Sequence, residues 1–265
     1  MLPADQIVNY FALVPAAERY ASGRPRLHAA FVEHIRAIAA PDGGRFAHAL
    51  DVGCGTGHST LALLDIAERV TGADISPAML ARAPRHPRIV YVEAPAERLP
   101  FPDGAFDLVT TGLAFHWFDQ PRFLAEAHRL LTAAGRLAIY TDTFPGEMIG
   151  NPAFAHWHGG TYGCRYPPPP RHPLLLADAD AEAAGFAPLA HERFTVEVTF
   201  TPEELAAFLT TQSNVNAAAD AGGEDVGAVR EWIIAEAAPL FQSPAATFPF
   251  RCALDIFRRA GSEAR

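Results

Sequence analysis

Three glycines stand within five positions, at Gly53, Gly55 and Gly57, directly behind an apolar run that ends at Val52. Alternating glycines let a chain turn tightly at the end of a strand, and they bring the backbone close to a ligand because no side chain intervenes. This spacing suits a nucleotide phosphate, but it suits other ligands as well. The neighbouring residues decide between them.

Two neighbours of the turn argue against a pyrophosphate. The dinucleotide pattern G-x-G-x-x-G would have glycine at position 58, where this chain has His58, and it would place the pyrophosphate near Asp51. A carboxylate repels that anion but attracts an ammonium or sulfonium group. We therefore expect a ligand with a cationic end, and a dinucleotide-dependent oxidoreductase becomes a distant alternative.

Two further acids follow the next predicted strands along the chain. Asp74 lies about 20 residues beyond Gly53, where a carboxylate accepts hydrogen bonds from a ribose diol, and Glu97 follows the third strand. Each acid also has a structural interpretation, since Asp51 would bond turn amides, Asp74 would cap the next helix and Glu97 would be solvated. Three acids at successive strand ends beside one glycine turn favour a ligand site.

A parallel sheet would bring these strand ends together. Between residues 45 and 140, short apolar runs alternate with helix-like segments, which is typical of an α/β fold. The expected strands are 45–53, 70–76, 88–94, 105–115 and 135–142, with a strand or hairpin at 186–200 and a last strand at 247–259. The expected helices are 57–70, 77–83, 120–131, 202–212 (capped by Thr201) and 227–241. We predict a doubly wound, mostly parallel seven-stranded sheet with a small cap formed by insertions.

The segment 143–173 is rich in glycine, proline and aromatic residues and shows no sustained periodicity. A connection of this length in a compact domain is more often a lid or a binding segment than an idle loop, and the prolines at 167–170 predict an extended spacer. Its candidate substrate-binding residues are His156, Tyr162 and Arg165, of which Arg165 would bind an acidic group through a bidentate contact. The histidines of this segment lack companion ligands at a recognisable spacing, so we predict no metal site.

Composition excludes several classes of function. Lys and Arg total 21 against 30 Asp and Glu, a net charge of −9, whereas binders of duplex DNA or anionic membranes normally present a basic face. The three cysteines are far apart, which predicts neither disulfides nor a zinc site and favours a reducing cytoplasm. The N-terminus lacks a basic start followed by a long apolar run, and no stretch is long enough to cross a bilayer. We expect a soluble cytoplasmic protein whose partner is a small molecule, with neither nucleic acid nor membrane as a partner.

Four segments resemble, in order and spacing, the motifs of class I S-adenosylmethionine-dependent methyltransferases. They are LDVGCGTG, VTGADIS, APAERLPFPDGAFDLV and LLTAAGRLAIY, within residues 50–140. The resemblance implies a Rossmann-like fold and S-adenosylmethionine as the cofactor. By similarity, Asp51 and the turn glycines would line its methionine part, Asp74 would bind the ribose, and Ile75 would flank the adenine. The family often has an acid where this chain has Pro95, so Glu97 or a backbone group would recognise the adenine amine.

Further segments resemble the trans-aconitate methyltransferase-like, or methyltransferase type 11, group. They are YASGRP at 20–25, AFHWFD and FLAEAHRLL near the fourth strand, and PEELAAFLTTQS in a helical cap before the last strand. In that group Tyr20 and Arg24 would close over the cofactor, with Arg24 reaching its carboxylate; the alternative is a helix N-terminus with ordinary surface charge. The implied organisation is a single methyltransferase domain over 1–265, with an N-terminal lid at 1–34 and substrate-cap insertions at 143–180 and 201–245. The implied cofactor-binding residues are Tyr20, Arg24, Asp51, Gly53, Cys54, Gly55, Asp74, Ile75, Met79, Ala96, Glu97 and Thr111.

A sulfonium methyl group is already a strong electrophile, so the protein mainly has to hold a nucleophile in line with the S–CH₃ bond. Orientation alone supplies roughly 7–11 kcal/mol in favourable cases. The N-P-P-Y or D-P-P-Y motif expected for methylation of base amino groups is absent after the fourth strand, where residues 111–117 read TGLAFHW. His116 would be a general base, since its usual pKa of about 6.5 suits neutral pH, or a packed residue that shapes the pocket. Trp117 would form the pocket wall or the core.

The sequence therefore predicts a methyltransferase that acts on a small molecule, with transfer to an oxygen of a carboxylate or a hydroxyl. One alternative is transfer to a carbon or nitrogen of a metabolite. A different alternative is a cofactor-binding protein without transferase activity, which would serve as a regulator or as a partner subunit.

Overall fold

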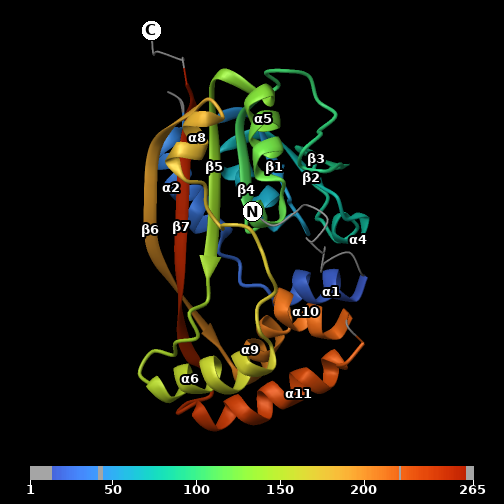
Figure 1. Ribbon diagram of the computed structural model, residues 1–265, viewed down its shortest axis with the longest axis vertical. Coiled ribbons are helices and arrows are strands. Elements are labelled where there is room, and N and C mark those ends of the chain that lie inside the picture. Colours follow the sequence, from blue (N-terminus) through green and yellow to red (C-terminus); the bar gives the residue numbers. More distant parts are fainter. Residues whose placement is uncertain (1–13, 41–43, 221, 261–265) are drawn as a thin grey trace.

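The sheet positions every part of the site, and its architecture confirms the predicted doubly wound, mostly parallel α/β fold. The computed structural model describes residues 14–40, 44–220 and 222–260. They form a seven-stranded sheet in the order β3-β2-β1-β4-β5-β7-β6 (Figure 1). The strands are β1 Phe46–Val52, β2 Ala67–Asp74, β3 Ile89–Glu93, β4 Phe106–Gly112, β5 Leu131–Thr143, β6 Phe186–Phe200 and β7 Ala246–Arg259. Strands β1 to β5 are parallel, and β7 runs antiparallel to both β5 and β6.

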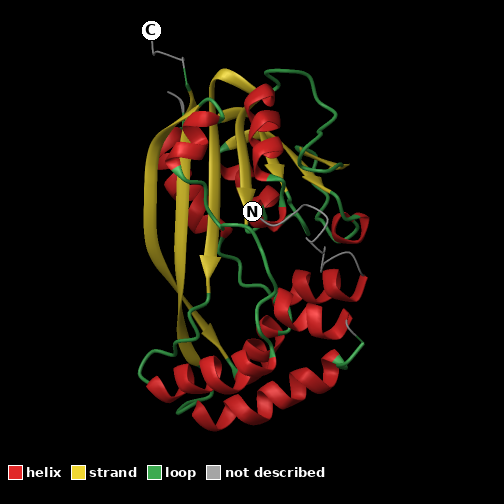
Figure 2. Ribbon diagram, viewed as in Figure 1, coloured by secondary structure: helices red, strands yellow, loops and turns green. Residues whose placement is uncertain are grey.

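Helices cover both faces of the sheet and also gather beyond one end of it. Helix α2 lies on one face, and α5 and α8 lie on the other (Figure 1). We call α6, α9, α10 and α11, which lie beyond the carboxyl end of β5, the helical cap (Figure 2). The helices are α1 Val14–Gly23, α2 His28–Ala39, α3 His58–Ala62, α4 Pro77–Leu80, α5 Gln120–Leu130, α6 Pro152–His156, α7 Gly163–Arg165, α8 Asp178–Ala183, α9 Pro202–Leu209, α10 Ser213–Asp220 and α11 Val226–Ala237. Within the described ranges, no helix is both long and apolar enough to cross a membrane.

Two hydrophobic clusters hold these layers together. One lies between α2 and the sheet and continues into the helical cap, with Phe31, Tyr140 and Phe208 among its members. The other lies between the sheet and the apolar side of α5. The antiparallel pair β6 and β7 reaches the cap, where the ring centroids of Phe200 and Phe250 lie 5.6 and 5.3 Å from that of Phe208. Because full burial of a phenylalanine contributes about 1.5–3 kcal/mol, these rings hold the cap against the sheet.

Helix α9 begins as the sequence predicts. Thr201 Oγ1 accepts a hydrogen bond from the Glu204 N–H at 3.2 Å, and the Glu204 carboxylate accepts one from the Thr201 N–H at 2.9 Å. This reciprocal capping box satisfies two N–H groups that the first helical turn leaves without partners. It fixes where the chain leaves β6 and enters the cap.

Two expectations about secondary structure were wrong. The helix expected at 57–70 ends earlier, because α3 stops at Ala62, one 3₁₀ turn follows, and Ala67 already begins β2. Ala67 is fully buried and pairs with Phe46 of β1, so sheet pairing overrides the helix-like composition. The segment 143–173, in which no helix was expected, is the second. Its residues 152–165 are helical, including a π-helical turn at Trp157–Tyr162, because Phe154 and Trp157 bury their rings.

Candidate active site

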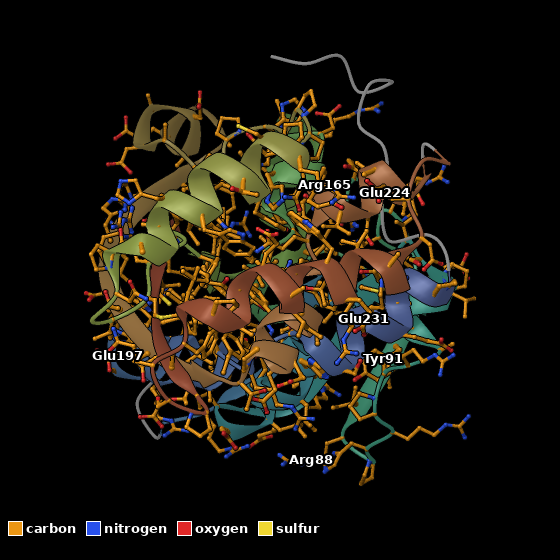
Figure 3. All side chains as sticks on the ribbon, turned by 90° about the horizontal axis from the view of Figure 1, so that it is seen from below. Arg88, Tyr91, Arg165, Glu197, Glu224 and Glu231 are labelled. Atoms are coloured by element: carbon orange, nitrogen blue, oxygen red, sulfur yellow. The ribbon has the colours of Figure 1, made fainter. Side chains whose placement is uncertain are left out.

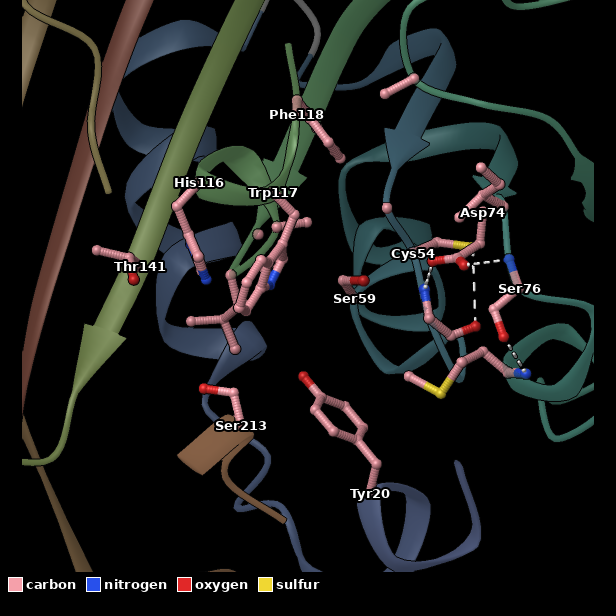
Figure 4. Close-up of a pocket in the computed structure, with 18 of the residues that line it drawn as sticks. Tyr20, Cys54, Ser59, Asp74, Ser76, His116, Trp117, Phe118, Thr141 and Ser213 are labelled. Atoms are coloured by element: carbon pink, nitrogen blue, oxygen red, sulfur yellow. Dashed lines mark hydrogen bonds between the residues drawn. The ribbon is translucent and has the colours of Figure 1, made fainter. Parts of the chain in front are cut away.

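A cavity of about 870 Å³ lies at the carboxyl ends of β1, β2, β4 and β5, and α1 and the start of α10 line its other side. Figure 4 shows Asp74 and His116 at opposite ends of it. We divide the cavity accordingly. The glycine half comprises Gly53, Cys54, Gly55, Asp74, Ile75, Met79, Ala96 and Glu97. The histidine half comprises Arg24, His28, His116, Thr141, Asp142 and Arg171.

The glycine turn has a backbone that only glycine adopts without strain. Gly53, Gly55 and Gly57 have φ angles of +69°, +53° and +74°. A Cβ at Gly53 would lie 2.5 Å from the Cβ of Ala114, and one at Gly57 would lie 2.5 Å from the Tyr91 hydroxyl. The turn therefore needs glycine both for its conformation and for its packing, and it presents bare backbone to the cavity.

Asp74 is oriented by the backbone on both sides of it. Its Oδ2 accepts a hydrogen bond from the Gly55 N–H at 2.8 Å, and its Oδ1 accepts one from the Ser76 N–H at 2.8 Å (Figure 4). Burial raises the pKa of Asp74, and the N–H groups that bond it lower that pKa in part. Each carboxylate oxygen has a further lone pair. Asp74 thus offers a fixed acceptor pair to a diol.

An apolar slot adjoins Asp74. Ile75 exposes 59% of its surface although its side chain is apolar, and Ala96 and Phe118 line the same cavity. Glu97 also lines it, and one of its oxygens accepts a hydrogen bond from the Asp119 N–H at 2.9 Å. Apolar surface beside a diol-binding carboxylate suits an aromatic base attached to a ribose.

Asp51 does not reach the cavity, which corrects the sequence expectation. Its side chain is fully buried and accepts hydrogen bonds from the hydroxyls of Ser59 at 2.6 Å, Thr60 at 2.7 Å and Thr110 at 3.2 Å. Burial raises the pKa of Asp51 to about 6. Asp51 therefore ties α3 to β1 and β4 beneath the turn. Thr111 is likewise fully buried and lies outside the cavity lining.

His116 is the central side chain of the histidine half. It lies in a 3₁₀ turn after Leu113, whose φ angle of +60° is unusual for a residue other than glycine. Only 7% of its surface is exposed, and its Nδ1 is buried without a hydrogen-bond partner. Burial lowers the pKa of His116 to about 3, with smaller contributions from the charges of Arg171 and Arg24. The imidazole is therefore neutral at neutral pH, and it faces the cavity beside Trp117 (Figure 4).

Helix α1 brings Tyr20 and Arg24 to the cavity, as the sequence predicts. The Arg24 guanidinium lies over the rings of Tyr20 and Phe208, 5.0 and 5.6 Å from their centroids, so it also contacts the cap. Of the predicted lid at 1–34, residues 1–13 lie outside the described residues.

Three residues of the histidine half were missed. Asp142 lies one residue before the end of β5, and Asp74 is the last residue of β2, so the same rule of acids at strand ends would have found Asp142. Burial raises the pKa of Asp142, and Arg24 lowers it in part. His28 Nδ1 lies 3.0 Å from the Tyr140 hydroxyl, and burial lowers its pKa to about 3. Arg171 gave no signal, because it follows a run of prolines without periodicity.

The structure corrects three predicted substrate contacts, because none of them lines the cavity. His156 is exposed, with its Nδ1 3.1 Å from the Pro152 carbonyl oxygen. Tyr162 is buried and donates a hydrogen bond to the Leu209 carbonyl oxygen at 3.3 Å. Arg165 pairs with Glu224 at 3.1 Å on the surface of the cap (Figure 3). Over the described ranges, no group of three or more His, Cys, Asp or Glu is placed to hold a metal ion.

Residues 50–139, which contain the glycine half and the turn with His116, match the family described as "Methyltransferase domain". This chain carries a class I S-adenosylmethionine-dependent methyltransferase domain. A protein from Anaeromyxobacter dehalogenans assigned as a type II methyltransferase has the same fold as this chain, with a TM-score of 0.62 and 25% identity. The match covers 89% of this chain and 96% of that one.

Curated relatives match part of the chain rather than all of it. Demethylmenaquinone methyltransferase from Thermus thermophilus is 43% identical over 98 residues, which cover 34% of this chain and 44% of the relative. Malonyl-[acyl-carrier protein] O-methyltransferase from Pectobacterium atrosepticum is 38% identical over 94 residues, which cover 35% of this chain and 37% of the relative. The chain thus spans less than half the length of either relative.

Proposed function

We propose that this chain transfers a methyl group from S-adenosylmethionine to an oxygen atom of a small acidic molecule. The orientation of Asp74 carries the cofactor assignment, because both carboxylate oxygens are fixed by backbone N–H groups and keep lone pairs for a ribose diol. The methyltransferase domain supports the same assignment. When bound, the cofactor supplies a methyl group on a positively charged sulfur, which is a strong electrophile.

The other residues of the glycine half fit the remaining parts of the cofactor. Ile75 and Ala96 would flank the adenine, and Glu97 or a backbone group would bind its amine. The bare backbone of Gly53 and Gly55 leaves room for the methionine part. In the predicted lid, Tyr20 and Arg24 line the same cavity, where the Arg24 guanidinium would bind the methionine carboxylate.

The charge state of His116 supports an acidic acceptor. A general base works best when its pKa lies near the working pH, whereas burial lowers the pKa of His116 to about 3. A carboxylic acid has a pKa of about 4 and is already ionised at neutral pH, so its oxygen needs no base. Holding that oxygen in line with the methyl group is then the main requirement. The chain is similar to an O-methyltransferase of malonyl-[acyl-carrier protein], which also supports transfer to oxygen.

Asp142 supports a second candidate acceptor, a hydroxyl group. Its carboxylate lines the histidine half at the end of β5, and burial raises its pKa toward the range in which a carboxylate accepts a proton effectively. An acceptor hydroxyl near Asp142 would therefore have a base available. Asp142→Asn separates the two candidates, because it would abolish transfer to a hydroxyl and leave transfer to a carboxylate largely unchanged.

Composition supports a small acceptor in a reducing compartment, and we include both in the proposal. The net charge of −9 disfavours nucleic acid and anionic membrane surfaces as acceptors. Cys54, Cys164 and Cys252 are all free, as is usual in the cytoplasm. The trans-aconitate-like subgroup and the division into a lid at 1–34 and cap insertions at 143–180 and 201–245 stay predictions.

The proposal is tested first by binding and then by turnover. Calorimetry should show that S-adenosylhomocysteine binds and that NAD does not, and the reverse result overturns the cofactor assignment. Turnover is followed with S-adenosylmethionine labelled in its methyl group and a panel of small carboxylic acids and phenols. Transfer to acids supports the proposal, and transfer to phenols alone favours the hydroxyl candidate. Tight cofactor binding with no transfer to any compound favours the non-catalytic alternative.

A further inference from the structure

The segment 167–176, which we call the strap, connects α7 to α8 (Figure 1). Its residues Pro168, Arg171 and Leu174 line the cavity. The strap begins with four consecutive prolines, which restrict φ and stiffen the chain. Two hydrogen bonds fix its position against the turn that carries His116. The His172 N–H donates to the His116 carbonyl oxygen at 3.3 Å, and Gln120 Nε2 donates to the Pro173 carbonyl oxygen at 2.8 Å. These two hydrogen bonds therefore hold the strap next to the turn that carries His116.

Arg171 is the strap's cation, and it lines the cavity. Among the described residues no carboxylate lies within 4.0 Å of its guanidinium, and no hydrogen bond from it is formed. Its charge acts on His116, whose pKa it lowers. In the same region Arg165 is paired with Glu224. Arg171 is exposed to solvent, and its charge lies at the histidine half without a carboxylate partner among the described residues.

His116 provides an independent observation at the same place. More than nine-tenths of its surface is buried, yet its Nδ1 has no hydrogen-bond partner. Buried polar atoms in folded proteins nearly always have a partner, so the unpaired Nδ1 of a side chain that lines the cavity is a candidate contact for a bound group. A neutral imidazole offers one N–H donor. A guanidinium offers parallel N–H donors in a planar fork that matches the two oxygens of a carboxylate.

We propose that Arg171 and His116 together bind a carboxylate of the acceptor, so that the strap selects acidic acceptors. This inference rests on the proposed function and adds to it the residues that recognise the acceptor. Arg171 is a specificity-determining residue, which supplies the charge and the planar fork, and His116 donates one further hydrogen bond. Arg24, at the contact between α1 and the cap, stays available for the cofactor.

The experiment uses the full chain saturated with S-adenosylhomocysteine. Succinate, tricarballylate and phenylacetate are the probes, their amides are the neutral controls, and binding is followed by saturation-transfer NMR and by calorimetry. We expect at least one acid to bind and its amide not to bind. Arg171→Gln should weaken acid binding by about tenfold or more, the size of a lost hydrogen bond to a charged group. Arg171→Lys should restore part of it. Arg165→Gln is the matched control and should bind the acid as the wild type does.

A second readout separates recognition from a merely structural role. A carboxylate that accepts a hydrogen bond from the neutral imidazole should fix which ring nitrogen carries the proton, and it should therefore shift the ring ¹⁵N resonances of His116 in the wild type. In Arg171→Gln the same acid concentration should leave these resonances unchanged.

The inference is overturned if no acid binds, if the amides bind as well as the acids, or if Arg171→Gln and Arg165→Gln behave alike. Binding of S-adenosylhomocysteine is measured in every variant. If S-adenosylhomocysteine binds neither the wild type nor any variant, the proposed function fails. If it binds all of them normally while Arg171→Gln keeps full acid binding, only the role of Arg171 fails.

Discussion

The glycine half and the histidine half of the cavity are assembled in different ways. All residues of the glycine half come from 53–97. They lie at the ends of parallel strands, in the turns after them or in the short helix α4, so the register of the sheet sets their positions. The histidine half draws Arg24, His116, Asp142 and Arg171 from four separate segments. Their positions depend on how α1, the strap and the cap pack against the sheet. A fold built in this way keeps its binding site for the methyl donor when the inserted segments change. The binding site for the methyl acceptor changes with those segments.

The largest effect is expected in the glycine half, for Gly53→Ala. The positive φ of Gly53 strains any other residue by about 1–2 kcal/mol, and the new Cβ would also collide with Ala114 at 2.5 Å. We expect S-adenosylhomocysteine binding to weaken by roughly hundredfold or more, as calorimetry would measure, because about 3 kcal/mol of combined strain falls on the site itself.

Gly104→Ala is the matched control for Gly53→Ala. Gly104 has nearly the same φ, +64°, but nothing lies within 4 Å of a Cβ placed there. Gly104→Ala should lower the free energy of unfolding by about 1 kcal/mol and leave cofactor binding unchanged. Equal binding of S-adenosylhomocysteine by Gly53→Ala and Gly104→Ala would contradict this expectation, because it would show that the glycine half tolerates a side chain at its turn.

The next largest effect is expected for Asp74→Asn. The amide keeps the shape of the side chain, but its NH₂ group cannot accept a hydrogen bond, so the N–H of Gly55 or of Ser76 would lose its partner. Loss of a hydrogen bond to a charged group costs about 1.5–3 kcal/mol, so we expect binding to weaken by roughly tenfold to hundredfold. Asp103→Asn, at an exposed acid that pairs with Arg129, should bind normally. Unchanged affinity of Asp74→Asn would remove Asp74 from the ribose site.

The difference in assembly between the glycine half and the histidine half also explains which site residues the sequence predicts. Asp74 and Glu97 were predicted because an acid after a strand marks the carboxyl edge of a parallel sheet, whereas Ile75 and Ala96 came from the family resemblance. The doubly wound fold follows from the alternation of strands and helices. Strand-end position does not, however, show which way a side chain points. Asp51 stands at such an end and is turned into the protein, where three hydroxyls bond it.

In the histidine half, residue type alone was misleading. Arg165 and Arg171 lie six positions apart in one irregular segment, and either guanidinium suits an acidic acceptor. Arg165 is paired by Glu224, far along the chain, while the strap carries Arg171 to His116. No periodicity records contacts of this kind, because they depend on tertiary packing of an irregular segment. The rule of acids at strand ends could also have predicted Asp142, because this acid lies near the end of β5.

A smaller effect, confined to the acceptor, is expected for His116→Gln. If His116 donates a hydrogen bond to an ionised acceptor, the KM for an acid substrate should rise by about tenfold while cofactor binding stays the same. Since burial lowers the pKa of His116 to about 3, kcat/KM of the wild type should show no titration of this residue between about pH 5 and pH 8. His156→Gln, at an exposed histidine outside the cavity, is the control. A fall in wild-type kcat/KM below about pH 6.5 that His116→Gln removes would make His116 a general base.

The smallest effect on binding is expected for Asp51→Asn, which tests whether Asp51 belongs beneath the glycine half or in it. Burial raises the pKa of Asp51 from 3.8 to about 6. Between these pH values the folded protein holds a proton that the unfolded chain has released, so the Asp51 contribution to stability decreases as pH rises from about 4 to about 6.

Asn cannot titrate, and its carbonyl oxygen still accepts a hydrogen bond from Ser59 or Thr60. The melting temperature of the wild type should therefore fall relative to that of Asp51→Asn as pH rises through this window, as thermal unfolding at a series of pH values would measure. Affinity for S-adenosylhomocysteine should change by less than about twofold, as for a residue that touches no ligand. If the melting temperatures of the wild type and of Asp51→Asn change with pH in the same way, another group holds the proton. A loss of affinity as large as that of Asp74→Asn would make Asp51 part of the ligand site, as its position at the end of β1 suggests from sequence alone.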